Sequence, residues 1–232
     1  MKLMPALPES IFDVAYLIFA ITSGALLLRK AAGRREIRLM GWAVLLLGCG
    51  DAFHLIPRVF AYWVESDLTA ALGIGKLVTS VTMTVFYLLL EYVREERYHA
   101  GTAQSARTAV WILTVLRIVL CVLPQNGWTS PDAPFSWGII RNIPFAVTGI
   151  LTVILWYKDA KADRPVRFLY LAVALSFVFY LLVVVLAGRF PMTGMLMLPK
   201  TVMYIWIICM FRKILKEGTQ LRSRGIPTSP TA

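Results

Sequence analysis

Three ionisable side chains stand inside one apolar run, in the stretch "GCGDAFHLIPR" at residues 48–58. Asp51, His54 and Arg58 are three and four residues apart, so a helix would carry all of them on one face. A carboxylate beside an imidazole can carry a proton or activate water, and a guanidinium can bind an anion. Pro57 cannot donate a backbone hydrogen bond and predicts a kink in this helix. The spacing therefore predicts a polar helix face that binds a ligand or carries a proton.

Further polar side chains lie in other apolar runs. Lys76 precedes Ser80 by one helical turn in "GIGKLVTS", and Lys200 precedes Tyr204 in the same way in "MLPKTVMY". In "IIRNIPF" the polar pair is followed by Pro144, which predicts a second kink. The candidate ligand-binding residues are Asp51, His54, Arg58, Lys76, Ser80, Arg141, Asn142, Lys200 and Tyr204.

The lysine and arginine candidates are expected at similar depth, in the outer half of a membrane. A charge at the bilayer centre costs about 2.5–3.5 kcal/mol, so such side chains should face the bundle interior and find partners. Asp13 and Asp51 are the obvious acidic partners, and they leave an excess of positive charge. A shared cavity would therefore bind an anion or a carboxylate. The alternative is that Arg58, Lys76 and Arg141 extend to the outer lipid headgroups.

Two further groups keep a structural and a functional interpretation open. Asp51 and His54 could form a structural hydrogen bond, or they could couple movement of a substrate to a proton. Arg117 is expected near mid-membrane, where Glu91 or Asp51 could pair with it. An ion pair of Arg117 with either acid could stabilise the fold or take part in function.

The composition indicates an integral membrane protein. The 232 residues are 58% hydrophobic and 16% charged, with a mean hydropathy of +0.69. Soluble domains carry about 25% charged and 45–50% apolar residues. One soluble core could not bury so much apolar surface, so the lipid bilayer is a predicted partner.

Seven runs approach the roughly 20 apolar residues that a spanning helix needs. Gly48 and Gly50 should let a neighbouring helix approach the second run closely. The runs form one predicted transmembrane domain, residues 1–217, followed by a short polar tail, residues 218–232, that is expected to be disordered. The predicted spans are residues 11–28, 39–63, 72–93, 108–123, 137–157, 168–188 and 195–215.

The distribution of basic residues predicts the topology. Seventeen Lys and Arg residues fall on one side of the predicted spans and two on the other. Basic loops remain in the cytoplasm, so the N-terminus should be outside and the C-terminus inside, in what we take to be a bacterial plasma membrane. The net charge of +11 is then a topology signal that faces anionic lipid, and nucleic acid is not predicted as a partner.

The first three and last three spans show a weak parallel similarity. "RREIRLMGWAVLL" at residues 34–46 aligns with "DRPVRFLYLAVAL" at residues 163–175, and "GIGKLV" with "MLPKTV" places Lys76 over Lys200. This suggests a 3+1+3 parallel repeat, an arrangement that SWEET-type transporters use with a site between the repeats. Seven spans in this orientation also occur in microbial rhodopsins. Chance similarity among apolar helices is the alternative.

These features favour a transporter for a small anion or carboxylate, with proton coupling as an option. A seven-helix ligand receptor or sensor is the main alternative. An intramembrane hydrolase, with Asp51 and His54 activating water and Ser80 as nucleophile, is less favoured because no motif joins them. No metal or cofactor is predicted, since His54 is the one histidine at membrane depth and His99 is expected in a solvated loop.

Lys200 in the last span also invites comparison with opsins, which bind retinal through such a lysine. The comparison fails nearby, because residues 195–215 contain no acidic residue and residues 168–188 contain neither tryptophan nor proline.

Overall fold

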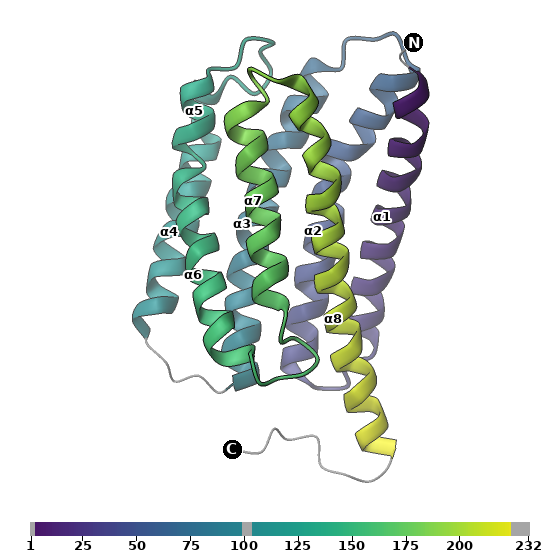
Figure 1. Cartoon of the computed structure of the whole chain (residues 1–232), viewed down its shortest axis with the longest axis vertical. Helices are drawn as coiled ribbons and strands as arrows, with labels where there is room; N and C mark the ends of the chain where they lie inside the picture. The colour runs from purple at the N-terminus through teal and green to yellow at the C-terminus, as the bar shows by residue number, and fades with distance from the viewer. Residues whose placement is uncertain (1–2, 99–103, 224–232) are drawn as a thin grey trace.

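The computed structural model describes residues 3–98 and 104–223. Within these ranges, seven helical segments are long and apolar enough to cross a membrane, which confirms the all-α class and the predicted number of spans (Figure 1). The helices are α1 (Leu3–Arg29), α2 (Arg35–Trp63), α3 (Thr69–Tyr98), α4 (Gln104–Val122), α5 (Phe135–Ile140), α6 (Ile143–Ala160), α7 (Leu169–Leu186) and α8 (Met197–Ser223), with the short 3₁₀ helices η1 (Pro124–Asn126) and η2 (Pro191–Leu196) in the connections.

The last helix extends beyond the expected domain boundary. α8 continues to Ser223, past residue 217, which the sequence analysis gave as the end of the transmembrane domain. The rest of that predicted tail, residues 224–232, and His99 lie outside the described residues.

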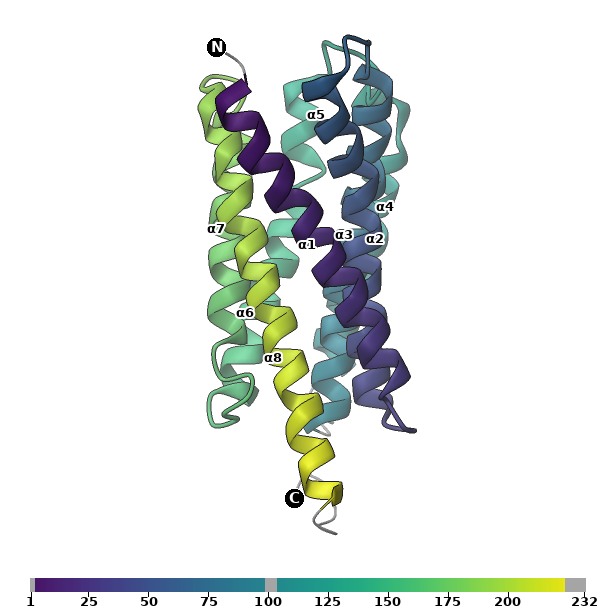
Figure 2. The same cartoon turned by 90° about the vertical axis from the view of Figure 1, so that its right-hand side faces the viewer.

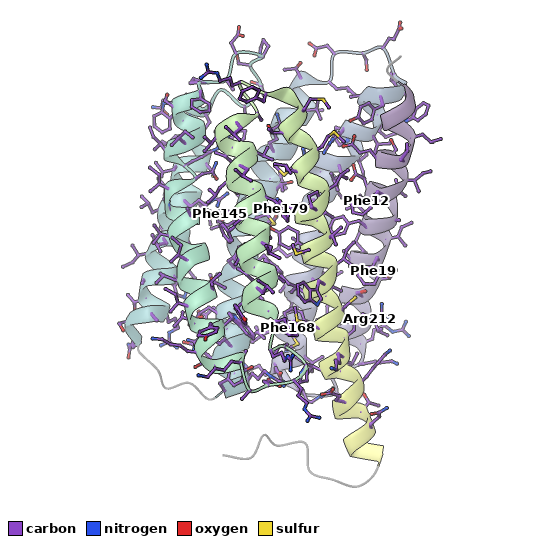
Figure 3. The ribbon with its side chains drawn as sticks, in the orientation of Figure 1. Phe12, Phe19, Phe145, Phe168, Phe179 and Arg212 are labelled. Atoms are coloured by element: carbon purple, nitrogen blue, oxygen red, sulfur yellow. The ribbon has the colours of Figure 1, made fainter. Side chains whose placement is uncertain are left out.

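The spans form a ring in chain order, in which each helix packs against the next and α8 packs against α1. α4 and α1 lie at opposite edges of the bundle in Figure 1, and Figure 2 shows α1 running obliquely between α8 and α2. Arg212 contributes to the contact between α8 and α1, because its guanidinium lies 5.5 Å from the centroid of the aromatic side chain of Phe19 of α1 (Figure 3). α1 begins at one end of the bundle and α8 finishes at the other. The external location of the α1 end and the 3+1+3 repeat stay predictions.

Glycines bring α2 close to both of its neighbours, as the sequence predicts. A methyl group on Gly48 would lie 3.0 Å from the Cβ of Ala20 on α1, and one on Gly50 only 2.0 Å from Thr82 Oγ1 on α3. The Thr79 hydroxyl of α3 donates a hydrogen bond to the Gly50 carbonyl at 3.0 Å. These contacts fix the rotation of α2, and hence the direction in which its polar face points.

α5 and α6 form one span that is interrupted at Arg141 and Asn142. Pro144 has no N–H to donate to the Ile140 carbonyl, so the helical hydrogen-bond ladder cannot continue there. The kink predicted at Pro144 is therefore a break, at which the chain makes a turn before α6 resumes the span. α2, in contrast, continues as a helix through Pro57.

A hydrophobic core fills the half of the bundle near the start of α2 and the end of α3. Ile37, Val44, Leu90, Trp156 and Phe211 are completely buried in it. Many large apolar side chains of the same helices face outward instead, as a lipid-exposed surface requires.

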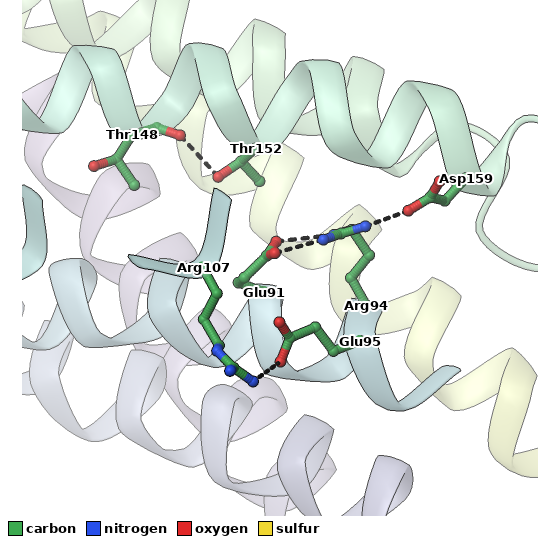
Figure 4. A network of polar contacts seen from close by, with 7 residues as sticks. All are labelled: Glu91, Arg94, Glu95, Arg107, Thr148, Thr152 and Asp159. Atoms are coloured by element: carbon green, nitrogen blue, oxygen red, sulfur yellow. Dashed lines mark hydrogen bonds and ion pairs between the residues drawn. The ribbon is translucent and has the colours of Figure 1, made fainter. Parts of the chain in front are cut away.

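Ion pairs connect the helices at the end of the bundle away from the start of α1 (Figure 1), and Figure 4 shows those of Arg94 from close by. Arg94 of α3, which is 1% exposed, lies 2.5 Å from Glu91 and also bonds Asp159 of α6. Arg97 bonds Glu36 of α2 at 2.5 Å. These contacts join α2, α3 and α6 and close this end.

Candidate functional site

The other half of the bundle contains a cavity of about 430 Å³. It reaches the exposed side chains of Lys76 and Phe135 at the end where α1 begins. Tyr204 does not line it but is buried beside Lys200, whose Nζ lies 5.4 Å from the tyrosine ring centroid. The other predicted site residues all line it: Asp51, His54, Arg58, Lys76, Ser80, Arg141, Asn142 and Lys200.

Positive charge exceeds negative charge in the cavity lining. Asp13 and Asp51 are the acidic residues that line it, and Arg58 is already paired with Glu9 of α1. Four other basic side chains remain against two carboxylates, so the lining is cationic even without Arg58. The basic lining residues are Arg58, Lys76, Arg117, Arg141 and Lys200.

Arg117 of α4 is a buried cation without an acidic partner in the described part of the chain. It is 1% exposed, and its Nε and Nη1 atoms have no hydrogen-bond partner there. Its guanidinium lies 3.3 Å from the ring centroid of Phe145 and also contacts the Cys121 thiol. Neither of its predicted partners bonds it, because Glu91 is bonded to Arg94 and Asp51 accepts a hydrogen bond from α1.

Asp51 faces α1 rather than His54. The Tyr16 hydroxyl donates to Asp51 Oδ2 at 2.7 Å, a contact that the sequence analysis missed. His54 Nδ1 is buried and has no partner among the described residues, and the His54 side chain interacts with the Leu72 backbone instead of with Asp51. Asp51 takes its side-chain hydrogen bond from Tyr16, so the expected Asp51–His54 hydrogen bond is not formed. Lys200 is close enough for its charge to act on Asp51, but the two are not among the ion pairs within 4.0 Å. The predicted contact of Asp51 with a cation is thus electrostatic rather than a direct bond.

Asp13 adds a second carboxylate to the α1 side of the cavity. It is 2% exposed, and its Oδ2 atom has no hydrogen-bond partner in the described chain. The charges of Asp13 and Asp51 act on each other. A buried acceptor that is left unpaired costs free energy, so a donor supplied by a ligand would be favoured here.

Lys200 is buried between two tyrosines rather than facing lipid. Its Nζ lies 4.9 Å from the ring centroid of Tyr180, and the side chain is 9% exposed. The Tyr180 hydroxyl donates to Asn142 Oδ1 at 2.7 Å, while the Asn142 amide donates to the Gly138 carbonyl at 2.8 Å. α7 and the α5–α6 turn thus hold this wall together.

The loop before α5 positions Arg141. Its guanidinium lies 4.1 Å from the ring centroid of Trp128, and its Nη1 donates to Asn126 Oδ1 at 2.8 Å. Arg58 is likewise paired with Glu9. Lys76 is exposed, whereas Arg58 and Arg141 are partly buried. Contact with the outer lipid headgroups, the alternative to a shared cavity, is therefore better supported for Lys76 than for the two arginines.

Several apolar residues that the sequence analysis did not select also line the cavity, among them Leu55, Met83, Phe145 and Val184. An apolar residue in a spanning helix fits lipid, core or cavity equally well, so the sequence carries no signal that separates them. Comparison of the chain with family models, curated proteins and solved structures gave no match.

Proposed function

We propose that this protein is a membrane transporter for a small organic anion, a carboxylate in the simplest case, which it binds in the cavity near the start of α1. The observation that carries the proposal is the buried guanidinium of Arg117, which lines a cationic cavity and lacks an acidic partner in the described chain. An anionic group bound there would supply charge-assisted hydrogen bonds that the described residues do not supply.

One feature supports transport over binding alone, and a second is compatible with it. The span of α5 and α6 is interrupted at the cavity, as in transporters whose discontinuous helices form the substrate site. The opposite end of the bundle is tied by the pairs around Arg94. A cavity open at one end and closed at the other is the arrangement expected of one state in alternating access. We place the α1 end outside a bacterial plasma membrane, on the charge distribution in the sequence.

A ligand receptor or sensor is the second candidate, since a closed cavity floor would serve it equally well. The hydrolase has less support. The Ser80 hydroxyl donates to the Lys76 carbonyl at 2.7 Å, and neither Asp51 nor His54 is bonded to it among the described residues. Proton coupling through Asp51 and His54 also loses support, because the two side chains are not bonded to each other.

The test has a binding step and a flux step. Purified protein is screened by thermal shift against carboxylates, phosphate and sulfate, and the strongest binder is then offered in radiolabelled form to proteoliposomes. We expect a carboxylate to raise the melting temperature and to accumulate in the vesicles. Binding without flux would instead support the receptor, and no stabilisation by any anion would contradict both candidates.

Variants locate the site within the same assay. Lys200→Ala should weaken carboxylate binding about tenfold, because it removes one buried charge-assisted contact. Lys76→Ala should weaken it less, since Lys76 is exposed. Arg58→Ala is also expected to have a smaller effect than Lys200→Ala, because Arg58 is engaged by Glu9. Unchanged binding by all three would place the ligand elsewhere.

A further inference from the structure

The two carboxylates of the cavity lie on other helices than two of its guanidinium groups, those of Arg117 and Arg141, while Arg58, Lys76 and Lys200 belong to neither group. Asp13 on α1 and Asp51 on α2 form an acidic wall, which we define by these two residues. Arg117 on α4 and Arg141 at the α5–α6 turn form a basic wall, and their charges act on each other. α1 and α4 lie on opposite sides of the helix ring (Figure 1). A ligand in this cavity therefore meets carboxylates on one side and guanidinium groups on the other.

Each wall leaves a buried atom without a partner among the described residues. Asp13 Oδ2 on the acidic wall is an acceptor without a donor, and Arg117 Nε and Nη1 on the basic wall are donors without an acceptor. Both side chains are at least nine-tenths buried. A simple anion would satisfy the basic wall alone and would add to the negative charge already at Asp13 and Asp51.

Lys200 does not neutralise the acidic wall. Its charge acts on Asp51 and also on Arg117, so it stands within reach of both walls. Asp13 and Asp51 take part in none of the ion pairs within 4.0 Å that join the described residues. One lysine also cannot balance two carboxylates, so the acidic wall keeps unbalanced negative charge.

We infer that the cavity binds a zwitterion with an apolar body, of the class of an amino acid or a short peptide. Its ammonium group would donate to Asp13 and Asp51, and its carboxylate would accept from Arg117 and Arg141. Leu55, Met83 and Phe145 supply apolar surface in the same cavity. The volume of about 430 Å³ falls in the range of small-molecule sites. The inference rests on the proposed function and narrows its substrate class.

Matched ligands test the requirement for both charges. L-phenylalanine is compared with 3-phenylpropanoate, which lacks the ammonium group, and with 2-phenylethylamine, which lacks the carboxylate. L-leucyl-L-leucine is compared with its N-acetyl derivative. Binding is measured by titration calorimetry on the full chain in lipid nanodiscs. We expect a zwitterion to bind at least about tenfold more tightly than its single-charge analogues, because each analogue leaves one wall unsatisfied.

Variants of the acidic wall test the contribution of the ligand's ammonium group separately from that of its carboxylate. Asp51→Asn should weaken the zwitterion about tenfold and leave 3-phenylpropanoate bound as well as before or better, because it removes negative charge while keeping an acceptor for Tyr16. Asp13→Asn should act in the same direction, and it provides a second measurement if the first variant folds poorly. Glu65→Gln, an acid-to-amide change at an exposed loop residue, is the matched control and should change nothing.

The outcomes distinguish the inference from the proposed function. If 3-phenylpropanoate binds as tightly as the zwitterions and neither acidic-wall variant discriminates between them, the zwitterion is wrong but the anion cavity stands. If the amine binds best, the basic wall is not the site of recognition and both fail. If no compound with a carboxylate binds, the proposed function itself is contradicted.

Discussion

Arg117 carries a charge that no acidic residue within the described ranges neutralises. Arg94 is buried to the same degree, yet it bonds Glu91 and Asp159. A buried ion pair contributes little net stability, but an isolated buried charge is costly because desolvation is not compensated. The two arginines are thus a matched pair in which the same substitution should have opposite effects.

Arg117→Leu should raise the stability of the ligand-free protein by roughly 1–3 kcal/mol, because it removes an uncompensated buried charge. It should also abolish stabilisation by carboxylates. Arg94→Leu should lower stability by about 3 kcal/mol or more, because it leaves Glu91 and Asp159 without their cation. Thermal unfolding with and without ligand measures both. A stabilising Arg94→Leu, or a destabilising Arg117→Leu, would contradict the assignment of partners.

At the scale of helices, the contact between α2 and α3 sets the direction of the α2 polar face. Gly50 and Thr82 leave no room for a larger residue at their contact, and Thr79 bonds the Gly50 carbonyl. A shift or rotation of α2 by one residue would carry Asp51 away from Tyr16. The site therefore depends on Gly50 and Thr82, which do not line the cavity.

Gly50→Ala should destabilise the protein by about 1–3 kcal/mol and weaken ligand binding, because its methyl group would lie 2.0 Å from Thr82 Oγ1 and would force the helices apart. Gly194→Ala is the control, since nothing lies within 4 Å of the added methyl group. Unfolding midpoints and ligand affinity are compared for the two variants. Equal effects would mean that the close approach at Gly50 is not needed.

Across the whole molecule, a cavity lined by charged and apolar side chains occupies one half of the bundle, and an apolar core with ion pairs closes the other. The proposed transport would require the closed end to open, and the bonds from Arg94 and Arg97 to neighbouring helices would then have to break. The prediction that these bonds hold the closed end shut can be tested by removing one of them.

Asp159→Asn should loosen the closed end, because it removes the charge that ties α6 to Arg94 of α3. We expect faster thiol labelling of a cysteine placed at buried Thr152, in a background without the native cysteines. Glu95→Gln, which removes the partly exposed pair with Arg107, is the control and should change labelling little. Identical rates for both variants would show that the Arg94–Asp159 contact does not close this end.

The predicted topology is tested by reporters at both ends of the chain. A reporter after Ala232 should be cytoplasmic and one at Met1 external, because seventeen basic residues lie on the predicted inner side. Activity of both reporters on the same side would contradict seven spans, and the reverse orientation would overturn the external assignment of the cavity.

The sequence alone determined the membrane class, the seven spans and the group of ionisable residues that must avoid lipid. These follow from local quantities: the length of each apolar run and the cost of a charge within it. It also predicted the close approach at Gly50, because small residues permit helix contact wherever they occur.

Only the tertiary structure decided which partner each charged side chain has. Tyr16 bonds Asp51, Arg94 takes Glu91, and Arg117 is left without an acid among the described residues. These choices depend on the order of helices around the ring and on the rotation of each helix. A spanning helix is apolar toward lipid and toward its neighbours alike, so its sequence pattern gives little information on rotation. Packing between helices, such as the contact of Gly50 with Thr82, supplies that information.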